Sequence, residues 1–518
     1  MDINMELETI IGLEVHLEIK TKTKLFCSCP NKSESLANEN ICPVCLGHPG
    51  VMPVLNLEAL KKALILGLAL NGKIAQTSYF ERKNYFYPDL PKGYQISQFA
   101  LPLVKGGFLE TSFSGGDNIR KKIHPPKSSE GGAAKPLFNR VSLERIHLEE
   151  DAAKLLHGNN KDSFVDFNRS GIPLIELVTK PDLRSAKEAK VFLEMLRLVA
   201  RYLDISEAEM QKGQMRCDAN ISLRPKGEKT FFAKTEIKNL NSFKAVEDAL
   251  SYEEKRQRKL WEEGRPPQTL STRGFDDKKR ITVLQREKEE SHDYRYFPEP
   301  DLPFLEIETL PFSLEELKES IKELPLAKKN RLMENYGFST TEAEILIREP
   351  VKANFLEEVI VQFEPQNREG LVKTAINWLV NRLPGEIISP KEKFLFQRIS
   401  EGEEKPINAK IFAEFVKLIF EGKISSTLAQ KILEEMKKTG KNPLLIIKES
   451  KIEMIADEKQ LEEIIKKIIE QNKKVVADFK KGKENALQFL VGLAMRETKG
   501  KADPQKASKI LKKFLQAL

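Results

Sequence analysis

Carboxylates and histidines in strand-like segments are the residues of this 518-residue chain that are best suited to chemistry. Within residues 11–20, Glu14, His16 and Glu18 alternate with aliphatic side chains. This period of two predicts a half-buried β-strand whose polar residues share one face. Two glutamates one step apart on that face repel each other and favour nearby water or a cation. For this stretch alone, the alternative is a solvated strand face.

A second group of acidic residues follows between residues 140 and 183. It consists of His147, Glu149, Glu150 and Asp151, together with Glu176 in the aliphatic string Pro-Leu-Ile-Glu-Leu-Val. We expect a carboxylate among aliphatic residues to be partly buried, where its charge must be paired, protonated or bound to a cation. Periodicity does not separate Glu149, Glu150 and Asp151 as candidate ligands. We expect His147 to have a structural role.

Oxygen and imidazole ligands that are brought together from separate strands suit Mg²⁺. Such an ion beside Lys83 or Arg82 would suit phosphoryl transfer, which depends on charge neutralisation and positioning. The sequence contains no Walker loop and no GxGxxG, HExxH or GxSxG motif, so a nucleoside triphosphate would be bound in another way. The candidate magnesium ligands are Glu14, His16, Glu150 and Glu176.

Four of the five cysteines are clustered, at Cys27, Cys29, Cys42 and Cys45. This spacing places four thiolates on two tight turns, which predicts tetrahedral coordination of Zn²⁺. Four sulfur ligands leave no open position on the metal, so the zinc would be structural. Cys217 stands alone and is expected to be a core residue.

Composition and charge place the chain among ordinary globular proteins, with 40% hydrophobic and 31% charged residues. No apolar run reaches the roughly 18 residues of a membrane helix, and the first residues do not resemble a signal peptide, so we expect a cytoplasmic protein that does not bind membranes. Residues 473–518 hold 12 basic and 4 acidic side chains. This excess predicts a polyanionic partner, although a solvated lysine-rich helical surface is the alternative.

Strand-like and helical segments are mixed up to about residue 305, and helical periodicity takes over from about residue 311. This pattern predicts a region of strands and helices that carries a zinc knuckle at 27–45, followed by helices. A second shift near 366–372 begins a basic tail of short helices at 371–518. The segment 113–139 is rich in Gly, Ser, Pro and Lys and is expected to be a surface insertion.

Seven sequence strings in order resemble one known family. They are IGLEVHLEIKT, RKNYFYPDLPKGYQISQ, RIHLEEDAAK, FNRSGIPLIELV, MRCDANISLRP, KTEIKNLNSF and DYRYFPEPDLP. Together with NALQFLVGLAMRETKGKADPQ near the end of the chain, they are similar to the B subunits of the aspartyl/glutamyl-tRNA amidotransferases, the GatB family. The cysteine knuckles fit the zinc-bearing members of that family.

The resemblance implies an α+β fold with a cradle-shaped, mixed-sheet kinase and transamidase domain at 1–305. Two all-helical domains would follow, a linker at 306–370 and a tail at 371–518 that binds tRNA. The chain would use ATP to phosphorylate the side-chain carboxylate of a tRNA mischarged with glutamate or aspartate, and ammonia would then displace the phosphate. An amidase, the A subunit, would supply the ammonia through a channel, and the heterotrimer would be completed by a small C subunit. The resemblance assigns the magnesium and catalytic positions to Glu14, His16, Glu150 and Glu176, and the channel mouth to Lys83.

Two other functions fit parts of the pattern. One is a non-enzymatic RNA-binding protein with a zinc knuckle, in which the carboxylates are merely solvated. The other is a magnesium-dependent hydrolase that acts on RNA. The sequence does not locate the ATP pocket, and it does not show whether Asp-tRNA(Asn), Glu-tRNA(Gln) or both are substrates. DNA is not an expected partner.

Overall fold

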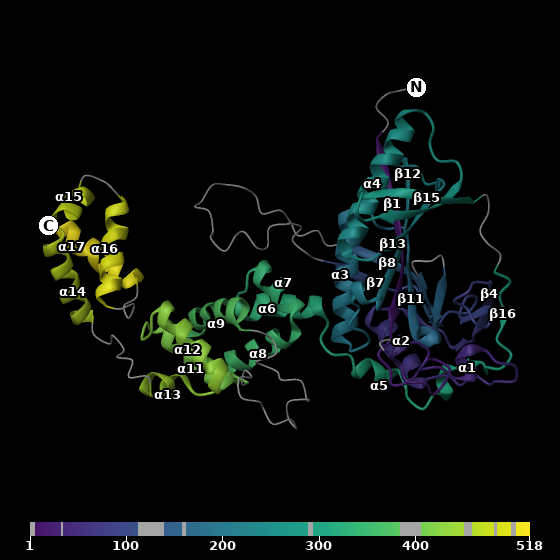
Figure 1. The fold of residues 1–518 in the computed structure, drawn as a ribbon, viewed down its shortest axis with the longest axis horizontal. Coiled ribbons are helices and arrows are strands. Elements are labelled where there is room, and N and C mark those ends of the chain that lie inside the picture. Colours follow the sequence, from purple (N-terminus) through teal and green to yellow (C-terminus); the bar gives the residue numbers. More distant parts are fainter. Residues whose placement is uncertain are drawn as a thin grey trace. The chain divides into compact units, whose positions relative to one another are not determined.

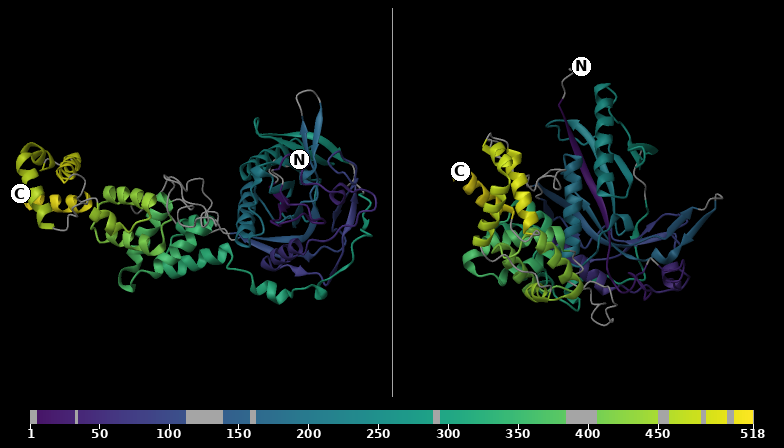
Figure 2. Two further views of the ribbon diagram at one scale, coloured as in Figure 1. Left: turned by 60° about the horizontal axis from the view of Figure 1, so that its bottom comes forward. Right: turned by 60° about the vertical axis from the view of Figure 1, so that its left-hand side comes forward.

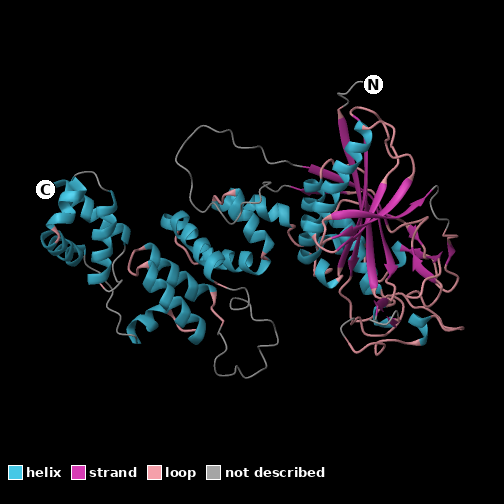
Figure 3. Cartoon of the chain, turned by 45° about the horizontal axis from the view of Figure 1, so that its top comes forward, coloured by secondary structure: helices cyan, strands magenta, loops and turns pink. Residues whose placement is uncertain are grey.

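A computed structural model of the chain describes residues 6–32, 35–111, 139–157, 162–288, 294–383, 406–449, 458–480, 484–498 and 504–517. The chain divides into two compact units, Met1–Lys328 and Lys329–Leu518. The strands belong to the first unit, and the second unit is helical (Figures 1 and 3). The predicted insertion at 113–139 lies outside the described residues except for Asn139. No helix in the described part of the chain is long and apolar enough to cross a membrane.

A ten-stranded mixed sheet is the centre of the first unit. Its neighbouring strands run antiparallel except for β13 and β14, which are parallel. The order of the strands is β15 (Ile281–Lys288), β14 (Leu270–Asp276), β13 (Thr235–Leu240), β12 (Met215–Pro225), β1 (Leu7–Glu18), β11 (Pro173–Thr179), β8 (Asn139–Glu150), β6 (Val104–Lys105) and β2 (Lys73–Ile74), and β7 (Phe108–Thr111) pairs with β8. The strand predicted at 11–20 is therefore a central strand of the sheet.

The side chains of strand β1 alternate between an apolar face and a polar face of the sheet. Leu13, Val15 and Leu17 are completely or almost completely buried, whereas the intervening Glu14 and His16 are partly accessible. The alternation in the sequence therefore reports the two faces of the strand, as predicted.

Two amphipathic helices, α3 (Ala186–Tyr202) and α4 (Phe243–Glu262), cover the apolar face. Each helix begins after a serine whose side chain accepts a hydrogen bond from the backbone of the first turn, Ser185 and Ser242. Thr9, on the apolar face of β1, donates to Glu254 of α4 over 2.8 Å. Helices α3 and α4 lie along the sheet in both views of Figure 2. The opposite face of the sheet is thereby left for the polar residues.

Short elements complete the first unit. They are the sheet of β16 (Phe297–Pro298), β4 (Glu81–Asn84) and β5 (Tyr94–Ser97), the pair β9 (Lys154–His157) and β10 (Ser163–Asp166), the pair β3 (Thr77–Ser78) and β17 (Leu305–Glu306), and the helices α1 (Pro43–Leu46), α2 (Leu57–Ala69) and α5 (Leu314–Glu319). Helix α6 (Pro325–Tyr336) contains the division between the two units.

The second unit consists of helices that pack through apolar faces. After α6 come α7 (Thr340–Arg348), α8 (Pro350–Val361), α9 (Arg368–Arg382), α11 (Ala409–Phe420), α12 (Ser426–Thr439) and α13 (Pro443–Glu449). Helices α8, α9 and α11 pack on one another, with Phe355, Phe412 and Phe415 buried among them. Lys329 and Glu344 form a buried ion pair of 2.8 Å that joins α6 to α7.

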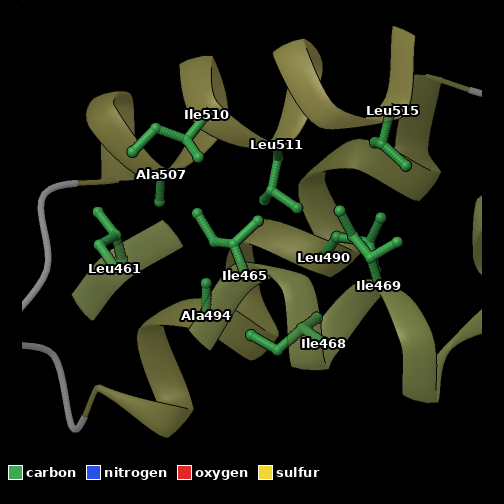
Figure 4. Packing of buried hydrophobic residues seen from close by; sticks show 10 residues of the cluster. All are labelled: Leu461, Ile465, Ile468, Ile469, Leu490, Ala494, Ala507, Ile510, Leu511 and Leu515. Carbon is green, nitrogen blue, oxygen red and sulfur yellow. The ribbon is translucent and has the colours of Figure 1, made fainter. Parts of the chain in front are cut away.

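The last four helices have a hydrophobic core of their own. They are α14 (Glu458–Gln471), α15 (Lys473–Lys480), α16 (Glu484–Glu497) and α17 (Pro504–Ala517). Figure 4 shows Ile465, Leu490 and Leu511 from three of these helices meeting in this core. Because the apolar side chains point inward, Lys466 and Lys467 of α14 and Lys509, Lys512 and Lys513 of α17 are exposed.

The predicted α+β fold, with a mixed sheet and a helical C-terminal part, is confirmed. The division of the helical part into a linker and a tail stays a prediction. Its proposed boundary at 370/371 falls inside α9, which runs from Arg368 to Arg382.

Candidate functional site

A row of charged residues crosses the polar face of the sheet at the middle of β1. In the strand register, His16 of β1 lies opposite Glu176 of β11 and also opposite Arg216 of β12. Glu176 in turn lies opposite His147 of β8. Four consecutive strands therefore bring two imidazoles, a carboxylate and a guanidinium into one line.

His16, Glu149 and Glu176 form the core of the site. His16 Nε2 lies 3.2 Å from Glu149 Oε1 and 3.4 Å from Glu176 Oε2. One ligand atom from each of the three residues lies within 4.8 Å of the other two. Both carboxylates are almost completely buried, with 2% of Glu149 and 4% of Glu176 exposed. Two carboxylate oxygens and an imidazole nitrogen form a donor set that fits a magnesium ion.

The charges of this cluster depend on one another. Burial alone would lower the pKa of His16, but its hydrogen bonds to Glu149 and Glu176 outweigh this effect and raise the pKa to about 10. Burial raises the pKa of Glu176, yet His147 and His16 hold it well below its usual value. Burial and the neighbouring Glu176 raise the pKa of Glu14. His16 and His147 therefore compensate Glu176, whereas Glu14 is not compensated, and His16 must release its proton before its nitrogen can bind a metal ion.

Further cations surround the carboxylates. Burial opposes the charge of Lys83 on β4, but Glu149 helps to raise its pKa above the ordinary value, and its Nζ lies 4.9 Å from the ring centre of Tyr294. Arg145 lies 3.4 Å from Glu176, and Arg216 donates to Asp151 over 2.6 Å. These groups line one cavity of about 840 Å³. It combines acidic ligands for a cation with basic side chains for an anion such as a phosphate.

The structure brings most of the expected site residues together but separates Glu150 from them. Glu14, His16, Glu176 and Lys83 all line the same cavity. Glu150 lies on the other face of β8 because consecutive residues of a strand point to opposite sides. Its carboxylate forms an ion pair with Lys92 and accepts the backbone N–H of Ile96 over 2.9 Å. Glu150 is therefore not placed to share an ion with His16 and Glu176.

Glu149 occupies the place expected of Glu150. We expected periodicity not to separate Glu149, Glu150 and Asp151, although the alternation in the string Arg-Ile-His-Leu-Glu does separate Glu149 from Glu150. Arg145, His147 and Glu149 alternate with apolar residues, so they belong to one strand face, and the structure places all three in the cavity. His147, expected to be structural, lies 3.5 Å from Glu176. Arg82, the other expected cation, instead forms a bidentate pair with Glu299 at 2.7 Å.

A second cavity of about 460 Å³ adjoins the first and shares Glu14, Arg145 and Lys234 with it. Phe231 and Phe232 supply its aromatic lining. Phe232 is fixed by an edge contact with Trp261, with the ring centres 5.0 Å apart, whereas Phe231 is 63% exposed. Sequence reasoning missed this cavity because its residues come from separate segments without a common pattern.

The four clustered cysteines meet as predicted. One sulfur from each of Cys27, Cys29, Cys42 and Cys45 lies within 4.8 Å of the other three. Hydrogen bonding from Cys27, together with the nearby Lys24, lowers the pKa of Cys45 to about 5 despite its burial. Four converging sulfurs fit a tetrahedral zinc ion. Cys217 is buried in the core of the sheet, as expected.

Comparisons with known proteins give one consistent family for the whole chain. The sequence matches the family described as the GatB/GatE catalytic domain over residues 9–311 and the GatB domain over residues 361–515. It is similar to proteins named as the B subunits of aspartyl/glutamyl-tRNA(Asn/Gln) amidotransferases. That of Carboxydothermus hydrogenoformans is 43% identical over 517 residues, that of Caldicellulosiruptor saccharolyticus 44% over 519, and that of Caldanaerobacter subterraneus 43% over 512. Each alignment covers 99% of this chain and 100% of the relative.

These matches do not favour the two other functions, a non-enzymatic RNA-binding protein and an RNA hydrolase. The two domain matches together span most of the chain, and the full-length relatives carry a single name. The chain therefore belongs to the GatB family, the B subunits of the tRNA-dependent amidotransferases, which are glutamine-dependent ligases that form carbon–nitrogen bonds.

Proposed function

We propose that the cavity on β1 activates the side-chain carboxylate of a mischarged Glu-tRNA(Gln) or Asp-tRNA(Asn) with ATP and then converts it to the amide. The observation that carries this proposal is the convergence of His16, Glu149 and Glu176 beside Lys83, in a chain of this family. The products would be Gln-tRNA(Gln) and Asn-tRNA(Asn).

The reaction has two steps, both of which need neutralised charge. An oxygen of the substrate carboxylate attacks the γ-phosphorus of ATP, and ADP leaves. Ammonia then attacks the acyl carbon, phosphate leaves with the bonding electrons, and one proton is lost from nitrogen. A magnesium ion held by His16, Glu149 and Glu176 would neutralise charge on the transferred phosphoryl group. Arg145 lines the same cavity and is suited to binding the phosphate oxygens and orienting the two anions.

Aromatic residues support the second step by limiting the access of water. An acyl phosphate hydrolyses, so the site should exclude water while ammonia is delivered. Tyr85, Tyr294 and Tyr296 line the cavity, and Tyr296 stacks on Phe99 with ring centres 4.4 Å apart. Burial raises the pKa of Tyr296 to about 12, so its phenol stays neutral. Lys83 lies among these rings, which suits the proposed channel mouth.

The second cavity is our proposed site for the nucleoside of ATP. Its aromatic lining suits a purine base, and Arg145 and Lys234 lie where the two cavities join, which suits the phosphate chain. Phe231→Ala is expected to raise the KM for ATP more than it lowers kcat, because the exposed ring would contact only the base. An unchanged KM in steady-state assays of the assembled enzyme would remove this assignment.

The partners follow from the same function. We propose that an amidase, the A subunit, supplies ammonia, that the heterotrimer is completed by a small C subunit, and that the enzyme works in the cytoplasm. The exposed lysines of α14 and α17 would hold the tRNA through its phosphates. The names of the relatives and the basic composition of residues 473–518 support these assignments.

Reconstitution tests the function directly. The chain is combined with its amidase and small partner subunits, ATP, Mg²⁺, glutamine and each mischarged tRNA, and the amino acid on the recovered tRNA is analysed. We expect glutamine on tRNA(Gln), asparagine on tRNA(Asn) or both, which also identifies the substrate. Cleaved RNA would indicate a hydrolase instead, and intact, unamidated tRNA without ATP turnover would indicate a binding protein.

A further inference from the structure

Lys24 is a completely buried lysine beside the cysteine cluster. Its Nζ lies 3.7 Å from Cys45 Sγ and 3.4 Å from the backbone carbonyl oxygen of Phe167. Cys45 itself is only 3% exposed. Among the described residues, Lys24 forms no ion pair with a carboxylate, so a sulfur atom is its nearest candidate for a negative partner.

A negative charge on the sulfur would compensate the buried ammonium group of Lys24. A buried ammonium group costs free energy unless an opposite charge compensates it, and a carbonyl oxygen or a neutral thiol does not supply that charge. Four thiolates around one Zn²⁺ carry a net charge of about −2, which the protein must also compensate on burial. The positive charge of Lys24 and the negative charge of the metal-bound thiolates therefore offset part of each other's desolvation cost.

The backbone holds the lysine in this position. The N–H of Lys24 donates to the carbonyl of Cys29 over 3.0 Å, and the N–H of Leu25 donates to the carbonyl of Gly171 over 2.9 Å. Gly171 has a φ of +84°, and a Cβ added there would lie 3.4 Å from Cys45 Cβ and 3.5 Å from Lys24 Cδ. The aliphatic part of Lys24 therefore packs beside Cys45, close to a glycine that has no side chain.

We propose that Lys24 is the counter-cation of the zinc–thiolate centre and that its ammonium group donates a hydrogen bond to the Cys45 thiolate. It is a positioning residue that acts through Cys45, and the proposal rests on a metal ion being bound by the four cysteines. A hydrogen bond from a cation withdraws electron density from a thiolate. Lys24 therefore makes Cys45 a weaker electron donor to the metal and a poorer nucleophile.

Cobalt substitution of the knuckle tests the electronic effect. Lys24→Met removes the charge and keeps an unbranched side chain, and Lys22→Met, at an exposed position two residues away, is the matched control. With Co²⁺ in place of Zn²⁺ in the assembled complex, the thiolate-to-cobalt absorption band of Lys24→Met should move to lower energy. The band of Lys22→Met should match that of the unchanged protein.

Alkylation of the zinc-loaded complex by iodoacetamide gives a second readout. Without the hydrogen bond, Cys45 should be alkylated roughly fivefold faster, as measured by mass spectrometry of the modified peptide. Lys24→Gln keeps a hydrogen-bond donor but no charge, so its alkylation rate should lie between those of Lys24→Met and the unchanged protein. This variant replaces Lys24→Met if the latter does not fold. An unshifted band and an unchanged rate in the lysine variants would overturn the proposal. Failure of the unchanged protein to bind Co²⁺ or Zn²⁺ would instead overturn the metal assignment.

Discussion

Glutamine substitutions at Glu149 and at Glu150 test which of these two glutamates binds the metal ion. The sequence pattern had not been expected to distinguish them. Glu149→Gln removes a negative charge from a cluster whose ligand atoms lie within 4.8 Å of one another. A cation among these atoms lies within about 4 Å of each of them, and a divalent cation and one carboxylate charge at that distance attract each other by roughly 8 kcal/mol at an effective dielectric of about 20. Affinity for Mg²⁺ should therefore fall by at least about a thousandfold, since each 1.4 kcal/mol is a factor of about ten.

Glu150→Gln should instead lower the stability of the protein and leave its affinity for the metal nearly unchanged. Its carboxylate and Lys92 are both nearly buried, with side-chain exposures of 3% and 6%, so the amide leaves a buried lysine without its counter-charge. Breaking a buried pair in this way costs roughly 3–5 kcal/mol of the free energy of unfolding. The cavity keeps His16, Glu149 and Glu176, so affinity for the metal should stay nearly unchanged.

Two measurements on the assembled complex distinguish these profiles. Titration with Mn²⁺, followed by electron paramagnetic resonance, gives metal affinity, and denaturant unfolding gives stability. Amidation with ammonium salt as nitrogen donor adds a functional readout that does not depend on the amidase. If Glu150→Gln loses the metal while Glu149→Gln retains both metal and activity, the strand-face argument is wrong and the metal lies elsewhere.

Three further changes test other parts of the molecule. Cys42→Ser should lower the zinc content measured by atomic spectroscopy and lower the melting temperature, because the knuckle has little apolar content of its own; unaltered metal content would contradict the zinc site. Lys83→Met should impair glutamine-driven amidation more than ammonium-driven amidation, and an equal loss would point to a direct chemical role. Removing residues 458–518, which have their own core, should weaken tRNA binding in gel shifts and reduce its salt dependence while leaving ATP binding intact; undiminished tRNA affinity would exclude the tail.

Local patterns were enough to find several features of this protein. The alternation around Glu14 and His16 predicted the central strand and its polar face, because side-chain direction in a strand depends only on position along the chain. The aliphatic neighbours of Glu176 predicted its burial, which the structure confirms at 4% exposure. The spacing of the cysteines predicted their meeting, because each short turn keeps two sulfurs together and a tetrahedral zinc ion would join the two pairs.

The sequence by itself therefore determined the presence of the strands, the buried carboxylate and the sulfur cluster, all of which follow from neighbours along the chain. The alternation places Glu149 on the same strand face as Arg145 and His147, but only the tertiary structure decided that this face lies beside His16, because that depends on β11 pairing with both β1 and β8. The tertiary structure also decided that Lys24 points at Cys45, and that Arg145 lies where the two cavities join. Such pairings depend on strand register and on segments far apart in sequence, and the local pattern of residues does not encode them.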